Sequence, residues 1–175
     1  MLLIRAVLFT IFVPGTAAGF LPYVIAKRWP EHFDFAIAHP VGPLLITAGF
    51  LLYGMSTFLF LKEGKGTPAI WFTTPLRVIL GEEPQKLVLS GLYQRTRNPM
   101  YLGVTVLVFG EALLSGNVAL CIYTIALWIF FHGVIVFVEE PHLRIRHGEQ
   151  YTMYCSRVPR WLGFRTTLPT RMHKA

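Results

Sequence analysis

The stretch QRTRNPMYLGV, residues 94–104, places two arginines and a proline directly before an apolar run. Asn98 is a residue type favoured at the N-cap of a helix, and Pro99 suits the first helical position. We therefore predict that a helix begins here with unpaired backbone N–H groups. With Arg95 and Arg97 beside it, this helix start is a candidate anion site, although arginines at a membrane boundary also contact lipid phosphates.

The whole chain has the composition of a membrane protein. Of its 175 residues, 54% are hydrophobic and 14% are charged, and the mean hydropathy is +0.52. A helix that crosses the hydrocarbon core needs roughly 20 apolar residues. We predict an all-α membrane protein with about four transmembrane helices, of which the third is short and the first is kinked at Pro14 and Pro22. The apolar segments are 2–25, 41–61, 100–114 and 118–138.

The net charge of +7 is distributed unevenly, and this predicts the orientation in the membrane. Most lysines and arginines lie between residues 62 and 97 or after Glu140. By the positive-inside rule these two parts and the N-terminus are cytoplasmic. Membrane orientation accounts for the basic charge, so no nucleic-acid partner is expected. Cys121 and Cys155 have neither a zinc spacing nor a disulfide framework.

We predict a single integral membrane domain over residues 1–175. Residues 62–99 form a 38-residue connection without strong periodicity. Such a connection is typical of a lid over a site or of a mobile linker, and both interpretations stay open. The predicted parts are a helix pair over 1–61, a cytoplasmic loop over 62–99, a helical hairpin over 100–138 and a cytoplasmic tail over 139–175.

The tail has the pattern of an amphipathic helix. Leu143, Tyr151, Tyr154 and Val158 fall near one helical face, whereas the charged residues fall largely elsewhere. We predict a C-terminal amphipathic helix on the cytoplasmic ends of the bundle, closed by Pro159. An interfacial membrane anchor has the same pattern.

An acidic pair is expected to meet the arginine stretch. Only residues 115–117 separate the third and fourth apolar segments, which predicts an antiparallel hairpin with both open ends on the cytoplasmic side. The acidic pair, Glu139 and Glu140, then lies at the C-terminal end of a helix, where the dipole disfavours anions by about 0.3–1 kcal/mol. A cationic partner is needed, either a ligand or an arginine. The candidate arginines are Arg95, Arg97, Arg144, Arg146 and Arg157.

His132 lies seven residues before Glu139 and hence on the same face of the predicted helix, about two turns deeper. An ionisable residue at that depth is a candidate for lining a functional pocket. A neutral histidine bonded to a neighbouring backbone group stays the alternative. No metal site is expected, because His132, His142 and His147 lack a recognised ligand spacing.

Two motifs together resemble a known group of membrane enzymes. GLYQRTRNPMYLG at 91–103, followed by EEPHLRIRHGEQYTMYCSRVPRWL at 139–162, is similar to the isoprenylcysteine carboxyl methyltransferase and phospholipid N-methyltransferase group. GKGTPA at 64–69 resembles the loop that often precedes the first motif. The family pattern commonly reads Arg-His-Pro, whereas this chain has Asn98 in the middle position and lacks a titrating ring there.

The resemblance implies S-adenosylmethionine as methyl donor and a lipophilic acceptor, either carboxylate, amine or thiol, that arrives from the bilayer. A carboxylate would be positioned by Arg144 or Arg157, whereas an amine or thiol would need Glu140 or His132 as a base. Gly103 is expected to allow close approach of a ligand or of the fourth helix. We expect Glu140 to be the most sensitive single position. The residues expected to bind the cofactor are Arg97, Asn98, Pro99, Tyr101, Leu102, Gly103, His132, Glu139 and Glu140.

Two other classes stay open. Membrane sterol and steroid reductases resemble this group in their C-terminal half, but they bind NADPH and would want extra basic residues for its second phosphate. A non-enzymatic membrane scaffold would bind no nucleoside tightly and would tolerate Arg97→Lys, which a bidentate carboxylate site would not. In every case the bilayer is a partner, and the sequence sets no oligomeric state.

Overall fold

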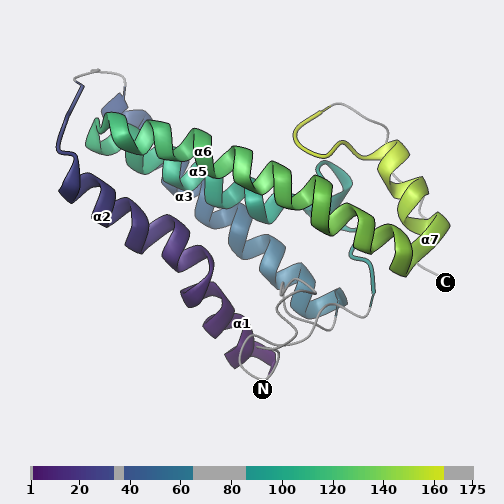
Figure 1. Cartoon of the computed structure of the whole chain (residues 1–175). Helices are drawn as coiled ribbons and strands as arrows, with labels where there is room; N and C mark the ends of the chain where they lie inside the picture. The colour runs from purple at the N-terminus through teal and green to yellow at the C-terminus, as the bar shows by residue number, and fades with distance from the viewer. Residues whose placement is uncertain (1, 34–37, 65–85, 164–175) are drawn as a thin grey trace.

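The computed structural model describes residues 2–33, 38–64 and 86–163 (Figure 1). Within these ranges the chain is helical and forms no strand, apart from an isolated bridge between His32 and Asn117. The prediction of an all-α membrane protein is confirmed. Three helical segments are long and apolar enough to span a membrane, and a fourth is shorter, as expected for the third apolar segment. The long segments are Leu3–Arg28, Pro40–Gly64 and Val118–Arg157, and the shorter one is Pro99–Ser115.

The first membrane segment is interrupted near both of its central prolines. The first α-helix ends at Phe12, two residues before Pro14, although the Val13 N–H still donates to the Phe9 carbonyl at 2.9 Å and the Val13 carbonyl accepts from the Ala17 N–H at 3.1 Å. Pro22 has no N–H to donate to the carbonyl four residues earlier, and just before it the Leu21 N–H donates to Thr16 in a wider π-helical turn. The helical hydrogen-bond pattern is therefore irregular near both prolines, whereas the predicted kinks stay a prediction. The elements are α1 (Leu2–Phe12), the π-helical η1 (Thr16–Phe20) and α2 (Leu21–Arg28).

The most extensive helix packing joins α3 to α5, and glycines make it possible. A Cβ atom on Gly49 would lie 2.6 Å from the Gly103 carbonyl oxygen, and one on Gly103 would lie 2.8 Å from the Tyr53 backbone nitrogen. Small residues let membrane helices approach this closely. The close approach at Gly103 is therefore to α3, and the expectation of the fourth helix there was wrong. The elements are α3 (Ala38–Leu59), the π-helical η2 (Phe60–Gly64) and α5 (Pro99–Ser115).

The predicted hairpin between α5 and α6 is confirmed. Gly116 ends α5 in the left-handed conformation, with φ 59°. Asn117 then caps α6 (Val118–Val134), because its side-chain oxygen accepts from the Leu120 N–H at 3.0 Å. The same side chain is fully buried and donates to the Trp29 carbonyl at 2.8 Å. The turn is thereby fixed to the end of α2.

The helix that begins as α6 does not end at the acidic pair. It continues through a π-helical turn, η5 (Ile135–Glu139), into α7 (Glu140–Arg157). The expected helix C-terminus at Glu139 and Glu140 was therefore wrong, and the dipole argument does not apply there. Pro141 has no N–H to donate to the carbonyl four residues earlier, and just before it the Glu140 N–H donates to the Ile135 carbonyl in the wider π-helical turn, so the helix accommodates this proline. Gly148, with φ 53°, instead bends α7 halfway along (Figure 1).

The amphipathic face predicted for the tail is confirmed. Tyr151, Tyr154 and Val158 are buried together with Leu89, and Leu143 packs against them. The Tyr154 hydroxyl also donates to the carbonyl of Tyr93, in the short 3-10 helix η4 (Gly91–Gln94), at 2.7 Å. Helix α7 is thereby tied to the segment that leads into α5, and Pro159 follows its end as predicted.

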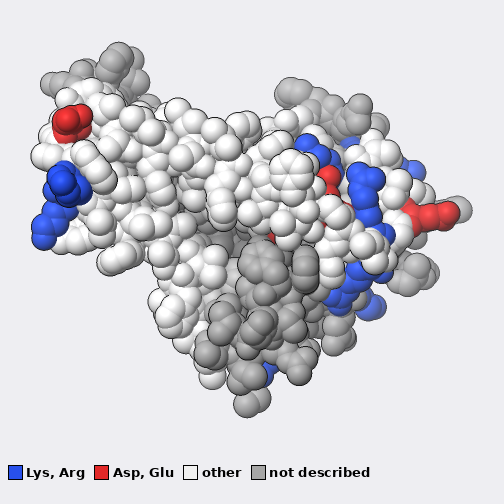
Figure 2. Space-filling view, in the orientation of Figure 1, with Lys and Arg blue, Asp and Glu red and all other residues white. Residues whose placement is uncertain are grey.

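Charged side chains gather toward the two ends of the molecule, and the described part of the middle of the visible face shows almost none (Figure 2). The larger gathering covers α7, and we call this end of the bundle, with the start of α5, the site end. An uncharged middle is what a hydrocarbon core of about 30 Å requires. The predicted loop falls largely on residues 65–85, which lie outside the described residues.

The α3/α5 packing predicts that Gly103→Ala lowers the free energy of unfolding by about 1–3 kcal/mol, the usual cost of overpacking, because the new methyl group meets backbone. Thermal unfolding in detergent measures this. Gly54→Ala, on α3, is the matched control, because a Cβ there meets nothing within 4 Å. Equal melting temperatures for the two variants would contradict the account.

Candidate active site

A cavity of about 200 Å³ opens among the first membrane segment, α3, α5 and α7. Its inner wall is apolar, and its polar side chains lie toward the site end. The apolar wall includes Phe9, Val13, Ala17, Val104 and Phe131, and the polar residues include Lys86, Arg97, Asn98, Tyr101, Glu139, His142 and His147.

Glu140 does not line this cavity but is buried beside two arginines, with a relative exposure of 6%. Arg97 Nη1 donates to Oε1 at 3.0 Å, and Arg160 donates to Oε1 at 2.7 Å through Nε and to Oε2 at 3.1 Å through Nη2. Both carboxylate oxygens are thus satisfied. The hydrogen bond from Arg160 to this carboxylate raises the pKa of the guanidinium above its ordinary value.

The sequence predicted a cationic partner for the acidic pair, either an arginine or a ligand, and Arg97 is such a partner for Glu140. Arg160 was missed, because it follows the amphipathic helix and belongs to no periodic pattern; its place three residues beyond the helix end was the available signal. Of the other four candidates, Arg95, Arg144 and Arg146 are exposed and Arg157 is half-buried.

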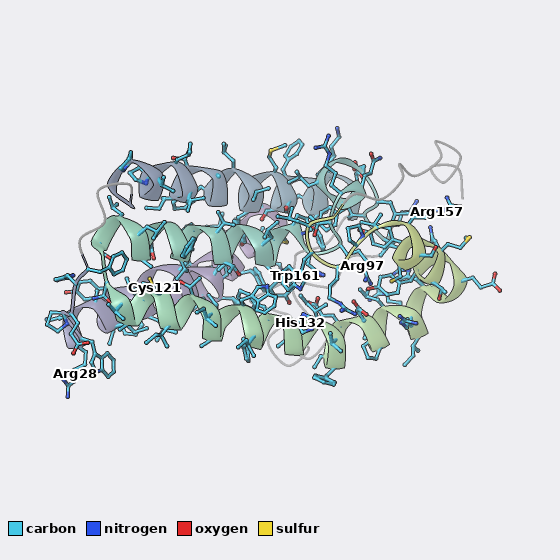
Figure 3. All side chains as sticks on the ribbon, turned by 90° about the horizontal axis from the view of Figure 1, so that it is seen from above. Arg28, Arg97, Cys121, His132, Arg157 and Trp161 are labelled. Carbon is cyan, nitrogen blue, oxygen red and sulfur yellow. The ribbon has the colours of Figure 1, made fainter. Side chains whose placement is uncertain are left out.

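The arginines expected to position an acceptor carboxylate lie elsewhere. Neither Arg144 nor Arg157 is among the described residues that line the cavity. Arg144 is exposed on α7, and Figure 3 places Arg157 apart from Arg97. The Nη1 atom of Arg157 is buried and has no hydrogen-bond partner among the described residues. Their catalytic roles stay predictions.

Glu139 is the member of the acidic pair that faces the cavity. The Tyr101 hydroxyl donates to its Oε1 at 2.5 Å, and the Tyr101 ring lies against Phe131 with centroids 4.7 Å apart. Adjacent helical residues point about 100° apart, so Glu139 and Glu140 reach different surroundings. The pair is divided into a carboxylate at the cavity and a carboxylate held between arginines.

Asn98 occupies the N-cap position of α5, but its side chain does not cap the helix. Its Nδ2 donates instead to the Arg160 carbonyl at 3.0 Å. The predicted cap was wrong in this respect, because residues 158–161 lie against the helix start and offer a carbonyl there. The Arg97 N–H also donates to this segment, to the Pro159 carbonyl at 3.0 Å.

The remaining predicted cofactor residues divide by location. Among the described residues, Pro99, Leu102, Gly103 and His132 do not line the cavity. His132 Nδ1 accepts from the Trp161 indole N–H at 3.1 Å. The alternative prediction was a histidine bonded to a neighbouring backbone group, whereas the partner found here is a side chain. Figure 3 shows the two rings close together near Arg97. Their roles toward a cofactor stay predictions.

Comparison with known sequences identifies the family. A sequence profile described as phospholipid methyltransferase matches residues 41–150. This range contains α5, α6 and the first part of α7, together with Arg97, Glu139 and Glu140. No solved structure matches the chain.

The curated proteins to which this chain is similar are all named as protein-S-isoprenylcysteine O-methyltransferases. The chain is 35% identical over 92 residues to protein-S-isoprenylcysteine O-methyltransferase B of Arabidopsis thaliana, covering 52% of this chain and 46% of that protein. It is 32% identical over 140 residues to a probable protein-S-isoprenylcysteine O-methyltransferase of Oryza sativa subsp. indica, covering 79% and 68%. A Schizosaccharomyces pombe protein-S-isoprenylcysteine O-methyltransferase is 35% identical over 74 residues, covering 42% and 31%. The chain thus spans less than half the length of the Arabidopsis and Schizosaccharomyces proteins.

The helical membrane bundle and the sequence profile together assign the chain to a family of integral membrane proteins. The chain belongs to the phospholipid methyltransferase family and is similar to proteins named protein-S-isoprenylcysteine O-methyltransferase.

The buried ion pairs predict that Glu140→Gln lowers the free energy of unfolding by about 3–5 kcal/mol, because two arginines lose their buried counter-charge. Thermal unfolding measures the loss. The control is Glu149→Gln, an exposed acid on the same helix, which should change the stability by about 0.5 kcal/mol or less. A Glu140→Gln melting temperature equal to that of the control would refute the assignment.

Proposed function

We propose that this protein transfers a methyl group from S-adenosylmethionine to the carboxylate of a lipophilic acceptor at the cytoplasmic face of a membrane. The observation that carries the proposal is the cavity, which joins an apolar wall inside the bundle to a polar end with groups of both signs. The family favours methyl transfer over the reductase and scaffold classes. The positive-inside rule favours the cytoplasmic face for the site end.

The polar end has groups that suit the methyl donor. Arg97 lines the cavity, and its Nε is buried without a hydrogen-bond partner among the described residues, so it has a donor left for a carboxylate. Glu139 offers a carboxylate to an ammonium or a sulfonium. Tyr101, which donates to Glu139, orients that carboxylate. When bound, S-adenosylmethionine supplies a methyl group that is already activated.

The tasks left to the chain are to align the acceptor and to exclude water. Phe131 and Val104 belong to a wall that suits a prenyl or similar chain. Lys86 and Arg97 at the polar end favour an anionic acceptor group. A carboxylate needs no general base, which agrees with an acidic pair whose buried member is held by two arginines. The O-methyltransferase names of the relatives support the same acceptor class.

An amine acceptor is the second candidate. The family profile takes its description from phospholipids, and Glu139 is a cavity carboxylate that could hold an ammonium or accept its proton.

Ligand binding tests the donor. Equilibrium binding to the detergent-purified protein should show saturation with S-adenosylmethionine and none with NADPH. Glu139→Gln should raise the dissociation constant at least about tenfold, because a charge-assisted contact is lost, while the melting temperature stays close to that of the wild type. Glu149→Gln is the control. Saturable binding of NADPH alone would overturn the proposal in favour of a reductase.

Methyl incorporation tests the acceptor. With labelled S-adenosylmethionine, we expect transfer to an S-farnesyl cysteine that has a free carboxylate and none to the matching carboxamide. Phosphatidylethanolamine vesicles are the comparison substrate. Label in the phospholipid amine and none in the farnesyl cysteine would replace the carboxylate acceptor by an amine.

A further inference from the structure

Residues 158–161, which we call the strap, follow α7 and lie against the start of α5. The strap accepts hydrogen bonds from the three residues directly before α5, which are Thr96, Arg97 and Asn98. The Arg97 N–H donates to the Pro159 carbonyl at 3.0 Å. The Arg160 carbonyl accepts from Asn98 Nδ2 at 3.0 Å and from the Thr96 hydroxyl at 3.2 Å. These bonds fix the strap to the residues that lead into α5.

Two side chains of the strap anchor it to the long helix formed by α6, η5 and α7. Arg160 bonds both carboxylate oxygens of Glu140, at 2.7 and 3.1 Å. Trp161 donates its indole N–H to His132 Nδ1 at 3.1 Å and stacks on that ring, with centroids 6.3 Å apart (Figure 3). Trp128 lies on the same cluster, 5.9 Å from the Trp161 ring. The anchors lie on both sides of the η5 turn.

The strap reaches the cavity through two of the residues that it holds. Arg97 and Asn98 both line the cavity. Asn98 is held by the Arg160 carbonyl, whereas the Arg97 guanidinium shares the Glu140 Oε1 atom with Arg160. Arg160 therefore fixes the carboxylate that in turn fixes Arg97.

We propose that Arg160 and Trp161 are positioning residues, which hold Arg97 and Asn98 in the cavity wall for the methyl donor. This inference rests on the proposed function. Side chains that are held before binding lose less freedom when the ligand arrives, so a fixed strap increases donor affinity. Because the coupling between two sites is reciprocal, bound donor in turn stabilises the strap in its position against the start of α5.

Donor binding is the first test, with Arg160→Gln and Arg160→Lys beside the wild type. The dissociation constant for S-adenosylmethionine should rise about tenfold in Arg160→Gln. Arg160→Lys should recover only part of the loss, because an ammonium does not reproduce the bidentate fork. At saturating donor, kcat should stay near the wild-type value, since neither Arg160 nor Trp161 is among the described residues that line the cavity. Leu162→Ala, an exposed neighbour with 75% relative exposure, is the matched control.

Trp161→Phe tests the second anchor without changing any charge. It keeps an aromatic ring for stacking but removes the indole N–H that bonds His132. We expect a smaller rise in the dissociation constant than in Arg160→Gln. This variant also carries the test should Arg160→Gln fail to fold.

Limited proteolysis is a readout independent of methyl transfer. Trypsin cleavage after Arg157 is possible in every variant, and it requires the end of α7 to open, since Val158 is fully buried. When the end of α7 opens and closes faster than trypsin cleaves, the cleavage rate follows the fraction of molecules in which this end is open. We expect cleavage about tenfold faster in Arg160→Gln, no change in Leu162→Ala, and slower cleavage of the wild type with saturating S-adenosylmethionine.

The outcomes separate the two proposals. Donor binding by the wild type, with the same affinity and cleavage rate in Arg160→Gln, would overturn the positioning role and leave the proposed function standing. Faster cleavage without any change in affinity would make the strap a purely structural element. Absence of S-adenosylmethionine binding by the wild type would overturn both.

Discussion

The site depends on the burial of the Glu140 carboxylate between Arg97 and Arg160. A buried carboxylate is tolerated only when its oxygens are paired, and here both are. The two arginines come from the residues before α5 and from the segment after α7. One carboxylate thus fixes three distant parts of the chain relative to one another and sets the position of the cavity wall.

This arrangement gives two neighbouring acids different tasks. Both carboxylate oxygens of Glu140 are paired with the two arginines. Glu139, at the end of the η5 turn, is therefore the acid that lines the cavity. Tyr101 holds it there by a hydrogen bond of 2.5 Å. The proposed chemistry needs little more from the chain, because an activated donor and a carboxylate acceptor require alignment and exclusion of water rather than proton transfer.

The features that the sequence predicted well are those set by local pattern. The apolar segments, the hairpin at Asn117 and the buried face with Tyr151 and Tyr154 follow from hydrophobic periodicity and capping. The features it missed depend on distant contacts. Gly103 meets α3 because of helix packing, and the Asn98 amide turns to a carbonyl 62 residues away. The change from apolar to charged residues at the acidic pair suggested a helix end, but charge alone does not end a helix.

The most direct measurement is an experimental structure of the protein with S-adenosylhomocysteine bound. The account predicts that this product occupies the cavity, with its carboxylate at Arg97 and its ammonium at Glu139, while Arg160 still pairs with Glu140. A ligand bound outside the cavity, or one whose ammonium lies away from Glu139, would contradict the account.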